Sequence, residues 1–401
     1  MKMLSIAWRY LLARPLAAGL NLLLLTLGLS SITFLLLVST QLDRAFERDL
    51  AGIDVVVGAK GSPMQLILAG VFHIDVPSGN IPLAAVQELE QDARIATLIP
   101  ISLGDTFRGF RIVGTTPAYA SHYGVPLQQG GLWSAPMQAV LGAQVAANTG
   151  LAVGNSFMGS HGLGMGGHDH GDSRYQVTGV LAPCGCVLDR LILTATESVW
   201  KVHEKATALD EEDQKIMEAE REITMALITY KSPLAAVSFP RFVNTTTEMQ
   251  AAAPAVEVTR LLRMVGVGTD VLRGFGAVLL LTAGLSVFIA LWNAVRERRA
   301  DLAMLRMLGA PPAKVAGLVV CEALLLAVLA IVLGLAVGHG LTHLAGTWMQ
   351  SERSIPLTGW IWLPAEWWVV GLGLAVAGLA ALLPALGAYR LDVTTLLHSR
   401  S

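Results

Sequence analysis

Long apolar stretches lie at both ends of this chain, and a large polar segment lies between them. Residues 15–42 contain no charged side chain, and three further apolar stretches follow at about 274–295, 315–341 and 367–389. Roughly 20 apolar residues are enough to cross about 30 Å of hydrocarbon, and the first stretch is too long for the apolar part of a signal peptide. The pattern therefore predicts one membrane span near the N-terminus and three close together near the C-terminus.

The polar segment, residues 43–273, carries the signals of mixed secondary structure. Alternation of apolar residues, β-branched runs and glycine turns indicate strands, whereas charged amphipathic stretches indicate helices. Strands are expected at 53–58, 108–114, 175–181 and 224–230, and helices at 81–91, 202–222 and 243–273. The last helix is expected to form a stalk that continues into the second span. The predicted fold is a four-helix membrane protein with a large α+β domain inserted between the first and second spans.

Composition agrees with this plan. Hydrophobic residues make up 53% of the chain and charged residues only 14%, with a formal net charge of -2. Such values are typical of a membrane protein with a substantial polar part. A near-neutral chain offers no basic surface for nucleic acid, so nucleic-acid binding is not expected.

The distribution of lysine and arginine predicts the orientation in the membrane. Positive residues flank the N-terminal side of the first span, fill the connection between the second and third, and follow the fourth: Lys2, Arg9, Arg14, Arg296, Arg298, Arg299, Arg306, Lys314, Arg390 and Arg400. Tryptophans instead mark the segment between the third and fourth spans. Because cytoplasmic flanks retain positive charge and indoles favour interfaces, both termini are expected inside and residues 43–273 in the periplasm of an inner-membrane protein.

The connection between the second and third spans, residues 296–312, is short and amphipathic. Leu302, Leu305, Met307 and Leu308 give it an apolar side, and Arg298, Arg299 and Arg306 give it a basic side. Gly309 is counted with these residues as part of the candidate docking segment. Pro311 and Pro312 then end the helix, since proline removes backbone donors. The residues alone leave two interpretations open: a docking helix for a soluble partner, or an interfacial helix lying on anionic lipid.

Motifs for catalysis are missing from the sequence. There is no phosphate-binding Gly-x-x-x-x-Gly-Lys-[Ser/Thr] loop, and His203-Glu204 lacks the second histidine of a His-Glu-x-x-His zinc motif. No Gly-x-Ser-x-Gly nucleophile elbow occurs either. The chain is therefore not expected to be an enzyme or to hold a cofactor of its own, and any ATP hydrolysis must come from another subunit.

A glycine-rich segment in the polar domain gathers metal-ligating side chains. His161, His168, Asp169, His170 and Asp172 lie within it, and Cys184 and Cys186 follow one predicted strand later. Imidazole, carboxylate and thiolate ligands suit Zn²⁺ or copper, so one hypothesis is a metal site. A hairpin would bring the two cysteines near the histidines. A solvated loop is the alternative. The cysteines are equally consistent with a disulfide in an oxidising compartment.

Polar and small residues inside the third span have ordinary structural explanations. Glu322 is expected to pair with an arginine of the connector rather than to relay protons, because a lone carboxylate in the membrane is costly. Gly334 and Gly338 are expected to allow close helix packing. His339 and His343 share a helix face, but two ligands do not make a metal site.

Three parts of the chain resemble FtsX-like permeases, the MacB and LolC/LolE (type VII) class of ABC transporter. The connector from Glu297 through Arg-Arg-Ala-Asp-Leu-Ala-Met-Leu-Arg-Met-Leu-Gly to Ala310 is similar to that family's C-terminal region. Residues 107–117 (Phe-Arg-Gly-Phe-Arg-Ile-Val-Gly-Thr-Thr-Pro), 140–146 and 151–154 look like its periplasmic core domain, and residues 384–393 resemble its closing motif. The corresponding domains are residues 1–42, 43–273 and 274–401.

The resemblance implies a permease subunit that binds two copies of a cytoplasmic ATPase through the connector and pairs with a second permease copy. ATP-driven closure would then move the periplasmic domain, for export or extraction of a lipoprotein or peptide, with a periplasmic or outer-membrane partner. The histidine-rich segment adds a metal-associated factor as a further candidate cargo. The alternative from a different class is a four-span scaffold or metal sensor. Stimulation of a bound ATPase would separate the two.

Overall fold

A computed structural model describes residues 3–160, 169–207, 220–351 and 357–391. The chain divides into two compact units. We call them the helical unit, which comprises Met1–Leu42, Met264–Gln350 and Pro356–Ser401, and the sheet unit, Asp43–Arg263. Each is described by itself.

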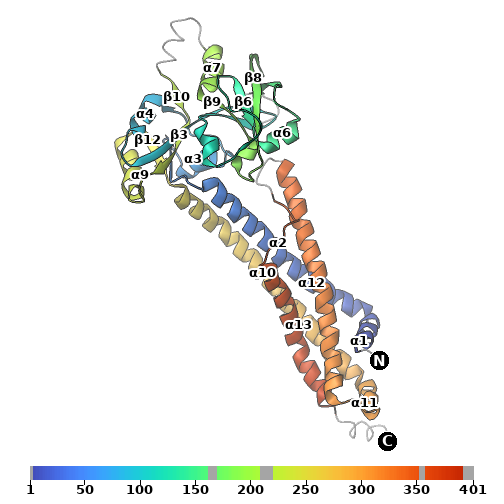
Figure 1. Cartoon of the computed structure of the whole chain (residues 1–401). Helices are drawn as coiled ribbons and strands as arrows, with labels where there is room; N and C mark the ends of the chain where they lie inside the picture. Colours follow the sequence, from blue (N-terminus) through green and yellow to red (C-terminus); the bar gives the residue numbers. More distant parts are fainter. Residues whose placement is uncertain (1–2, 161–168, 208–219, 352–356, 392–401) are drawn as a thin grey trace. The chain divides into compact units, whose positions relative to one another are not determined.

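The helical unit contains the membrane-length helices (Figure 1). Its helices are α1 (Met3–Leu12), α2 (Pro15–Leu50), α10 (Pro254–Glu297), α11 (Arg299–Met307), α12 (Pro312–Ser351) and α13 (Glu366–Tyr389), of which α2 and α10 extend beyond the unit. Within the described residues, four of these helices are long and apolar enough to cross a membrane: α2, α10, α12 and α13. The prediction of four spans, with an α+β domain between the first and second, is confirmed.

Close packing of α12 against α2 depends on two glycines. A Cβ added to Gly334 would lie 2.8 Å from Leu29 Cβ, and one added to Gly338 would lie 2.7 Å from Thr33 Cβ. Small residues four apart allow two helices to approach closely in a membrane, where helix association depends on van der Waals packing. The structural role expected for these glycines is confirmed.

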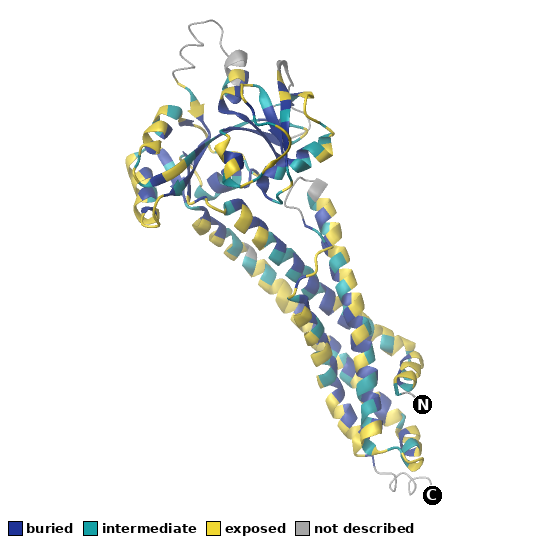
Figure 2. Cartoon of the chain, in the orientation of Figure 1, coloured by how far each residue is buried: buried dark blue, intermediate teal, exposed yellow. Residues whose placement is uncertain are grey.

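Exposed residues are frequent along the helices of the helical unit (Figure 2), and many of them are large apolar residues, as expected of helices that face lipid. Leu16 is 89% exposed, Leu281 74% and Leu379 70%. Tryptophans are exposed near the ends of α12 and α13, among them Trp348, Trp360 and Trp368. Indoles in such positions are typical of a membrane interface.

The sheet unit is built on a ten-stranded mixed sheet in the order β12-β1-β11-β3-β4-β9-β6-β8-β5, with β7 pairing β3 and β8. The strands are β1 (Val55–Ala59), β3 (Ile95–Phe107), β4 (Phe110–Thr115), β5 (Leu127–Gly130), β6 (Gln138–Leu141), β7 (Ser156–Ser160), β8 (Asp169–Leu181), β9 (Leu191–Ala195), β11 (Met225–Tyr230) and β12 (Met249–Ala252). A separate pair joins β2 (Ile81–Pro82) and β10 (Glu222–Ile223). The two pairings β4·β9 and β6·β8 are parallel.

Short helices complete this unit: α3 (Pro63–Gly70), α4 (Leu83–Glu90), α5 (Ala118–His122), α6 (Ala143–Thr149), α7 (Thr196–Thr207), α9 (Ala235–Thr246) and the 3₁₀ turn η1 (Val187–Arg190). One apolar core gathers around Phe239 and Ile228 and a second around Ile192 and Tyr175. The β3–β4 hairpin turns at Arg108 and Gly109, with φ of 47° and 76°. Positive φ at both central residues matches the right-handed twist of a two-residue hairpin.

Two expectations for this unit need correction. The helix predicted at 243–273 is interrupted, because α9 ends at Thr246, β12 pairs with β1, and α10 begins only at Pro254. Pro254 therefore begins a helix, a position where its missing donor has no cost. In the region predicted as a helix at 202–222, α7 ends at Thr207, residues 208–219 lie outside the described residues, and Glu222 belongs to β10.

Candidate functional site

The connector between the second and third spans contains a separate helix with a defined end. Arg298 is the N-cap of α11, which closes at Leu308. Gly309 has a φ of 94°, its N–H donates to the Arg306 carbonyl, and the Ala310 N–H donates to the Leu305 carbonyl, both at 3.0 Å. This pair of bonds around a left-handed glycine is the Schellman motif, which satisfies the last carbonyls of a helix. Gly309 thus ends α11 and separates it from α12.

The inner side of α11 is part of the core of the helical unit. Leu302 and Ala303 are 3% and 6% exposed, and Leu305 packs against the same apolar cluster. The Arg306 guanidinium donates to the Leu391 carbonyl, which follows α13. Leu302, Leu305 and Arg306, which the sequence suggested as docking residues, therefore hold the helix against the rest of the helical unit.

Arg298 attaches the connector to two other helices of the unit. Its Nη1 lies 3.6 Å from Glu322 Oε2, its Nη2 donates to the Tyr10 carbonyl at 3.3 Å, and its guanidinium stacks 4.0 Å from the Tyr10 ring centroid. Both charged side chains of the pair are nearly buried, at 13% and 11% exposed. The expectation that Glu322 pairs with an arginine of the connector is confirmed. Arg298 therefore links α11 to α1 and α12.

The outer side of α11 is apolar and exposed. Met304, Met307 and Leu308 are 51%, 55% and 85% exposed, and Arg299 is exposed beside them. We call Arg299, Met304, Met307 and Leu308 the connector surface. The sequence prediction included three of these residues but not Met304. Met304 lies three residues before Met307 and four before Leu308, and this helical spacing could have identified it.

The histidine-rich segment joins two paired strands. Ser160 at the end of β7 pairs with Asp169 at the start of β8, so the two ends of the segment are adjacent. His161 and His168 lie outside the described residues, and for Asp169, His170 and Asp172 only the backbone, in β8, is described. Among the residues that the structure describes, no group of three metal-ligating side chains occurs.

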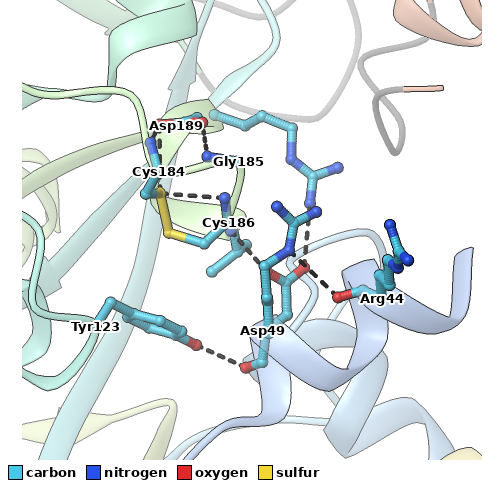
Figure 3. Close-up of a disulfide and its surroundings, with 10 residues drawn as sticks. Arg44, Asp49, Tyr123, Cys184, Gly185, Cys186 and Asp189 are labelled. Carbon is cyan, nitrogen blue, oxygen red and sulfur yellow. Dashed lines mark hydrogen bonds and ion pairs between the residues drawn. A yellow bond between two sulfur atoms is a disulfide. The ribbon is translucent and has the colours of Figure 1, made fainter. Parts of the chain in front are cut away.

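The assignment of Cys184 and Cys186 to that metal site is wrong. The two residues form a disulfide, so neither offers a thiolate (Figure 3). They also follow the far end of β8, and at about 3.3 Å per residue the strand separates Asp169 from Leu181 by about 40 Å. The hairpin that was expected to bring the cysteines near this segment does not do so, because β8 lies between Asp169 and the cysteines.

Several ionisable side chains are buried together in the sheet unit. His73 Nε2 shares a hydrogen bond of 3.0 Å with the Tyr119 hydroxyl, and among the described residues its Nδ1 has no hydrogen-bond partner. Burial, reinforced by the positive charges of Arg111 and Arg190, holds the pKa of His73 well below its usual value. Burial likewise lowers the pKa of both arginines. His73 is therefore neutral in the folded protein.

Comparison with protein families matches both halves of the chain. Residues 18–234 match the MacB-like periplasmic core domain, and residues 273–393 match the FtsX-like permease C-terminal domain. No match was found among curated protein sequences.

Two solved structures are similar to part of the chain. The periplasmic region of MacB from Actinobacillus actinomycetemcomitans is 13% identical with a TM-score of 0.35, and the alignment covers 53% of this chain and 95% of that one. The extracellular domain of the noncanonical ABC-type transporter YknZ from Gram-positive bacteria is 10% identical with a TM-score of 0.31, covering 49% and 98%.

The first family match alone spans more than half of the chain, and the second lies on α10–α13, where the connector surface is found. Such a domain is typically the non-catalytic transmembrane part of its complex, and the ATPase lies elsewhere. The chain belongs to the FtsX-like, MacB-type family of ABC transporter permeases, as a multi-pass membrane subunit with a MacB-like extracytoplasmic domain.

Proposed function

We propose that the connector surface is where a cytoplasmic ABC ATPase docks and that this permease passes the motion of the ATPase to its periplasmic domain. The observation that carries the proposal is the two-sided character of α11. Its inner side is anchored by Leu302 and Arg298, while the outer side leaves Met304 and Leu308 exposed. Exposed apolar side chains next to a charged residue are typical of a protein interface.

The anchoring of α11 supports a mechanical role. Arg298 and Arg306 attach the helix to α1, α12 and the segment after α13, so a displacement of α11 would displace those elements as well. On its N-terminal side, α11 follows α10, which runs without a break from Pro254 to Glu297. Pro254 in turn follows β12 of the sheet unit, with only Ala253 between them. A continuous helix is a stiff connection for transmitting force.

The proposed orientation places both termini and α11 in the cytoplasm of an inner-membrane protein and the sheet unit in the periplasm. It is supported by the arginines and lysines around α11 and near both termini, since positive residues are retained on the cytoplasmic side. A reporter phosphatase that is active only in the periplasm would be inactive when fused to the C-terminus in this orientation. An active fusion would exclude the orientation.

The partners and cargo of the proposed transporter follow the family pattern. Two copies of this chain would bind an ATPase dimer, and a periplasmic or outer-membrane protein would receive the cargo. The cargo classes proposed are a lipoprotein, a peptide or a metal-associated factor, moved or extracted without necessarily crossing the membrane.

Substitution of one exposed leucine tests the docking proposal. Leu308→Glu places a charge on the connector surface, and we expect the ATPase to be lost when the permease is purified in detergent. Leu234→Glu is the matched control, because Leu234 is 81% exposed and Leu308 85%. Retention of the ATPase by Leu308→Glu would contradict docking at α11 and favour an interfacial helix on lipid or a membrane scaffold.

As a second function, we propose that the segment between β7 and β8, together with the start of β8, binds Zn²⁺ through His161, His168, Asp169, His170 and Asp172. The close pairing of Ser160 with Asp169 supports this, because it brings both ends of the ligand-bearing segment together. Replacing the three histidines by alanine should abolish Zn²⁺ binding by the full-length protein in calorimetry, while His343→Ala should not. Equal binding by both variants would exclude the site.

A further inference from the structure

The Cys184–Cys186 disulfide joins residues only two apart in the loop between β8 and η1 (Figure 3). A disulfide stabilises a fold mainly by closing a long loop in the unfolded chain. The Cys184–Cys186 bond spans a single glycine, so it closes almost no loop, and it does not connect distant elements. Its effect must therefore be local, on the conformation of the loop that carries it.

Asp189 holds the backbone of that loop. The Cys184 N–H donates to Asp189 Oδ1 at 3.0 Å, and the Gly185 N–H donates to Oδ2 at 2.7 Å. Gly185 has a φ of 65°, a left-handed conformation that favours glycine. The disulfide and one carboxylate thus fix the three residues together.

The same loop contacts the last turn of α2, within the sheet unit (Figure 3). The Val187 N–H donates to Asp49 Oδ1 at 2.8 Å, and Arg190 Nη2 lies 3.9 Å from Asp49 Oδ2. The Tyr123 hydroxyl donates to the Asp49 carbonyl at 2.8 Å. Asp49 is only 4% exposed, so these contacts are shielded from water. A change in the loop at Cys186 therefore reaches α2 through the adjacent Val187.

Gly185 lies equally close to α2. A Cβ added to Gly185 would lie 2.5 Å from Arg48 Nη1. Both the disulfide loop and its neighbour Val187 therefore pack on the same helical turn. The helix they contact is the one whose apolar part, residues 15–42, forms the first membrane span.

We infer that Cys184–Cys186 is a reversible thiol–disulfide exchange site, whose oxidised form holds the loop against the last turn of α2. The two sulfurs differ in access, since Cys186 is 8% exposed and Cys184 is only half-buried. An external dithiol is therefore expected to attack Cys184. This inference does not depend on where the ATPase docks.

The exchange balances with one dithiol as the reductant. Its first thiolate attacks Cys184 Sγ, the disulfide bond breaks, and Cys186 leaves as a thiolate. The second thiolate of the reductant then attacks the reductant's own sulfur in the mixed disulfide and releases Cys184. The reductant is oxidised to a disulfide by loss of two electrons and two protons, and each cysteine gains one electron and one proton. The reverse sequence restores the Cys184–Cys186 bond.

Reduction gives Asp189 a new donor. Cys184 Sγ lies 3.4 Å from Asp189 Oδ1. In the disulfide this sulfur carries no hydrogen, whereas a Cys184 thiol can donate to that oxygen and compete with the backbone N–H that now binds it. Without the covalent bond, Cys186 is free to separate from Cys184. We expect the Val187 hydrogen bond to Asp49 to weaken as a result.

Hydrogen exchange on the full-length protein in lipid nanodiscs tests the inference. Reduction by dithiothreitol should be reversible without unfolding, should make Cys184 and Cys186 alkylate together, and should speed exchange at Val187 and in residues 44–50 at least tenfold. The Cys321→Ser variant should respond identically. The Cys184→Ser/Cys186→Ser double variant should exchange at the reduced rate with or without dithiothreitol.

Three outcomes would overturn the inference. The first is alkylation of both cysteines before any reductant is added. The second is resistance of the disulfide to dithiothreitol until the protein unfolds, which would make it a permanent covalent link. The third is complete reduction with unchanged exchange at Val187, which would show that the bond does not control the contact with Asp49.

Discussion

Arg298 and Arg299 are neighbours in the sequence, but their side chains have different surroundings. Arg298 is paired with Glu322 and stacked on Tyr10, whereas Arg299 is exposed on the connector surface. Removing one member of a buried pair leaves the other charge unpaired, which typically costs about 3–5 kcal/mol. A substitution at Arg298 would therefore report on folding, and only the exposed residues can report on docking.

His73 predicts how the stability of the sheet unit depends on pH. Its pKa is lowered on folding, so below about pH 6.5 the unfolded chain binds a proton that the folded protein does not. Stability is therefore retained above that pH and falls as the pH decreases. Between pH 7 and 5.5 this single group should cost about 1 kcal/mol.

Pulse proteolysis in urea of the full-length protein in detergent measures this effect. The His73→Gln variant, whose amide can still reach Tyr119, should lose about 1 kcal/mol less than the natural protein over the same pH range. An equal loss in the two proteins would show that His73 is not the group responsible.

At the scale of elements, the packing of α12 on α2 can be tested with two glycines of the same helix. Gly338→Ala should destabilise the protein by about 1–3 kcal/mol, because its Cβ would lie 2.7 Å from Thr33 Cβ and 3.1 Å from the Ser30 carbonyl oxygen. Gly340→Ala is the control, since nothing lies within 4 Å of its added Cβ. The folded fraction after heating in detergent measures both, and equal losses would contradict close packing at Gly338.

The elements that could be predicted from the sequence are those set by local pattern. The four apolar helices, β11 and the end of α11 at Gly309 each have a periodic or turn signal of their own. β12 does not, because Met249–Ala252 has little intrinsic strand preference and becomes a strand only by pairing with β1. The anchoring of Arg306 likewise depends on Leu391, far away in the sequence, and no local pattern indicates it.

For the cysteines, too, local sequence pattern was not enough to predict the chemistry. Spacing alone allowed Cys184 and Cys186 to be metal ligands or a disulfide, and only the length of β8 and the S–S bond decide between them. The sequence located the connector correctly, but not which of its residues face inward. That division depends on contacts with α1, α12 and Leu391.

At the scale of the whole molecule, one chain combines a membrane unit with an extracytoplasmic domain, and its family works together with an ABC ATPase. The chain order is the reason for this division: the sheet unit is inserted between α2 and α10, so both of its ends continue into membrane helices. We propose that a motion entering at α11 passes along the chain into α10, and that the contact of the disulfide loop with the end of α2 responds to redox state. The account rests on α11 as the point of entry.

Photo-cross-linking from the connector surface tests that claim most directly. A photoreactive amino acid at position 308, in cells that also produce the ATPase, should cross-link to the ATPase, and one at position 234 should not. Both positions are highly exposed, so a difference in cross-linking would reflect where the residue lies and not how accessible it is. Absence of a cross-link from position 308, or equal cross-linking from both positions, would contradict the account.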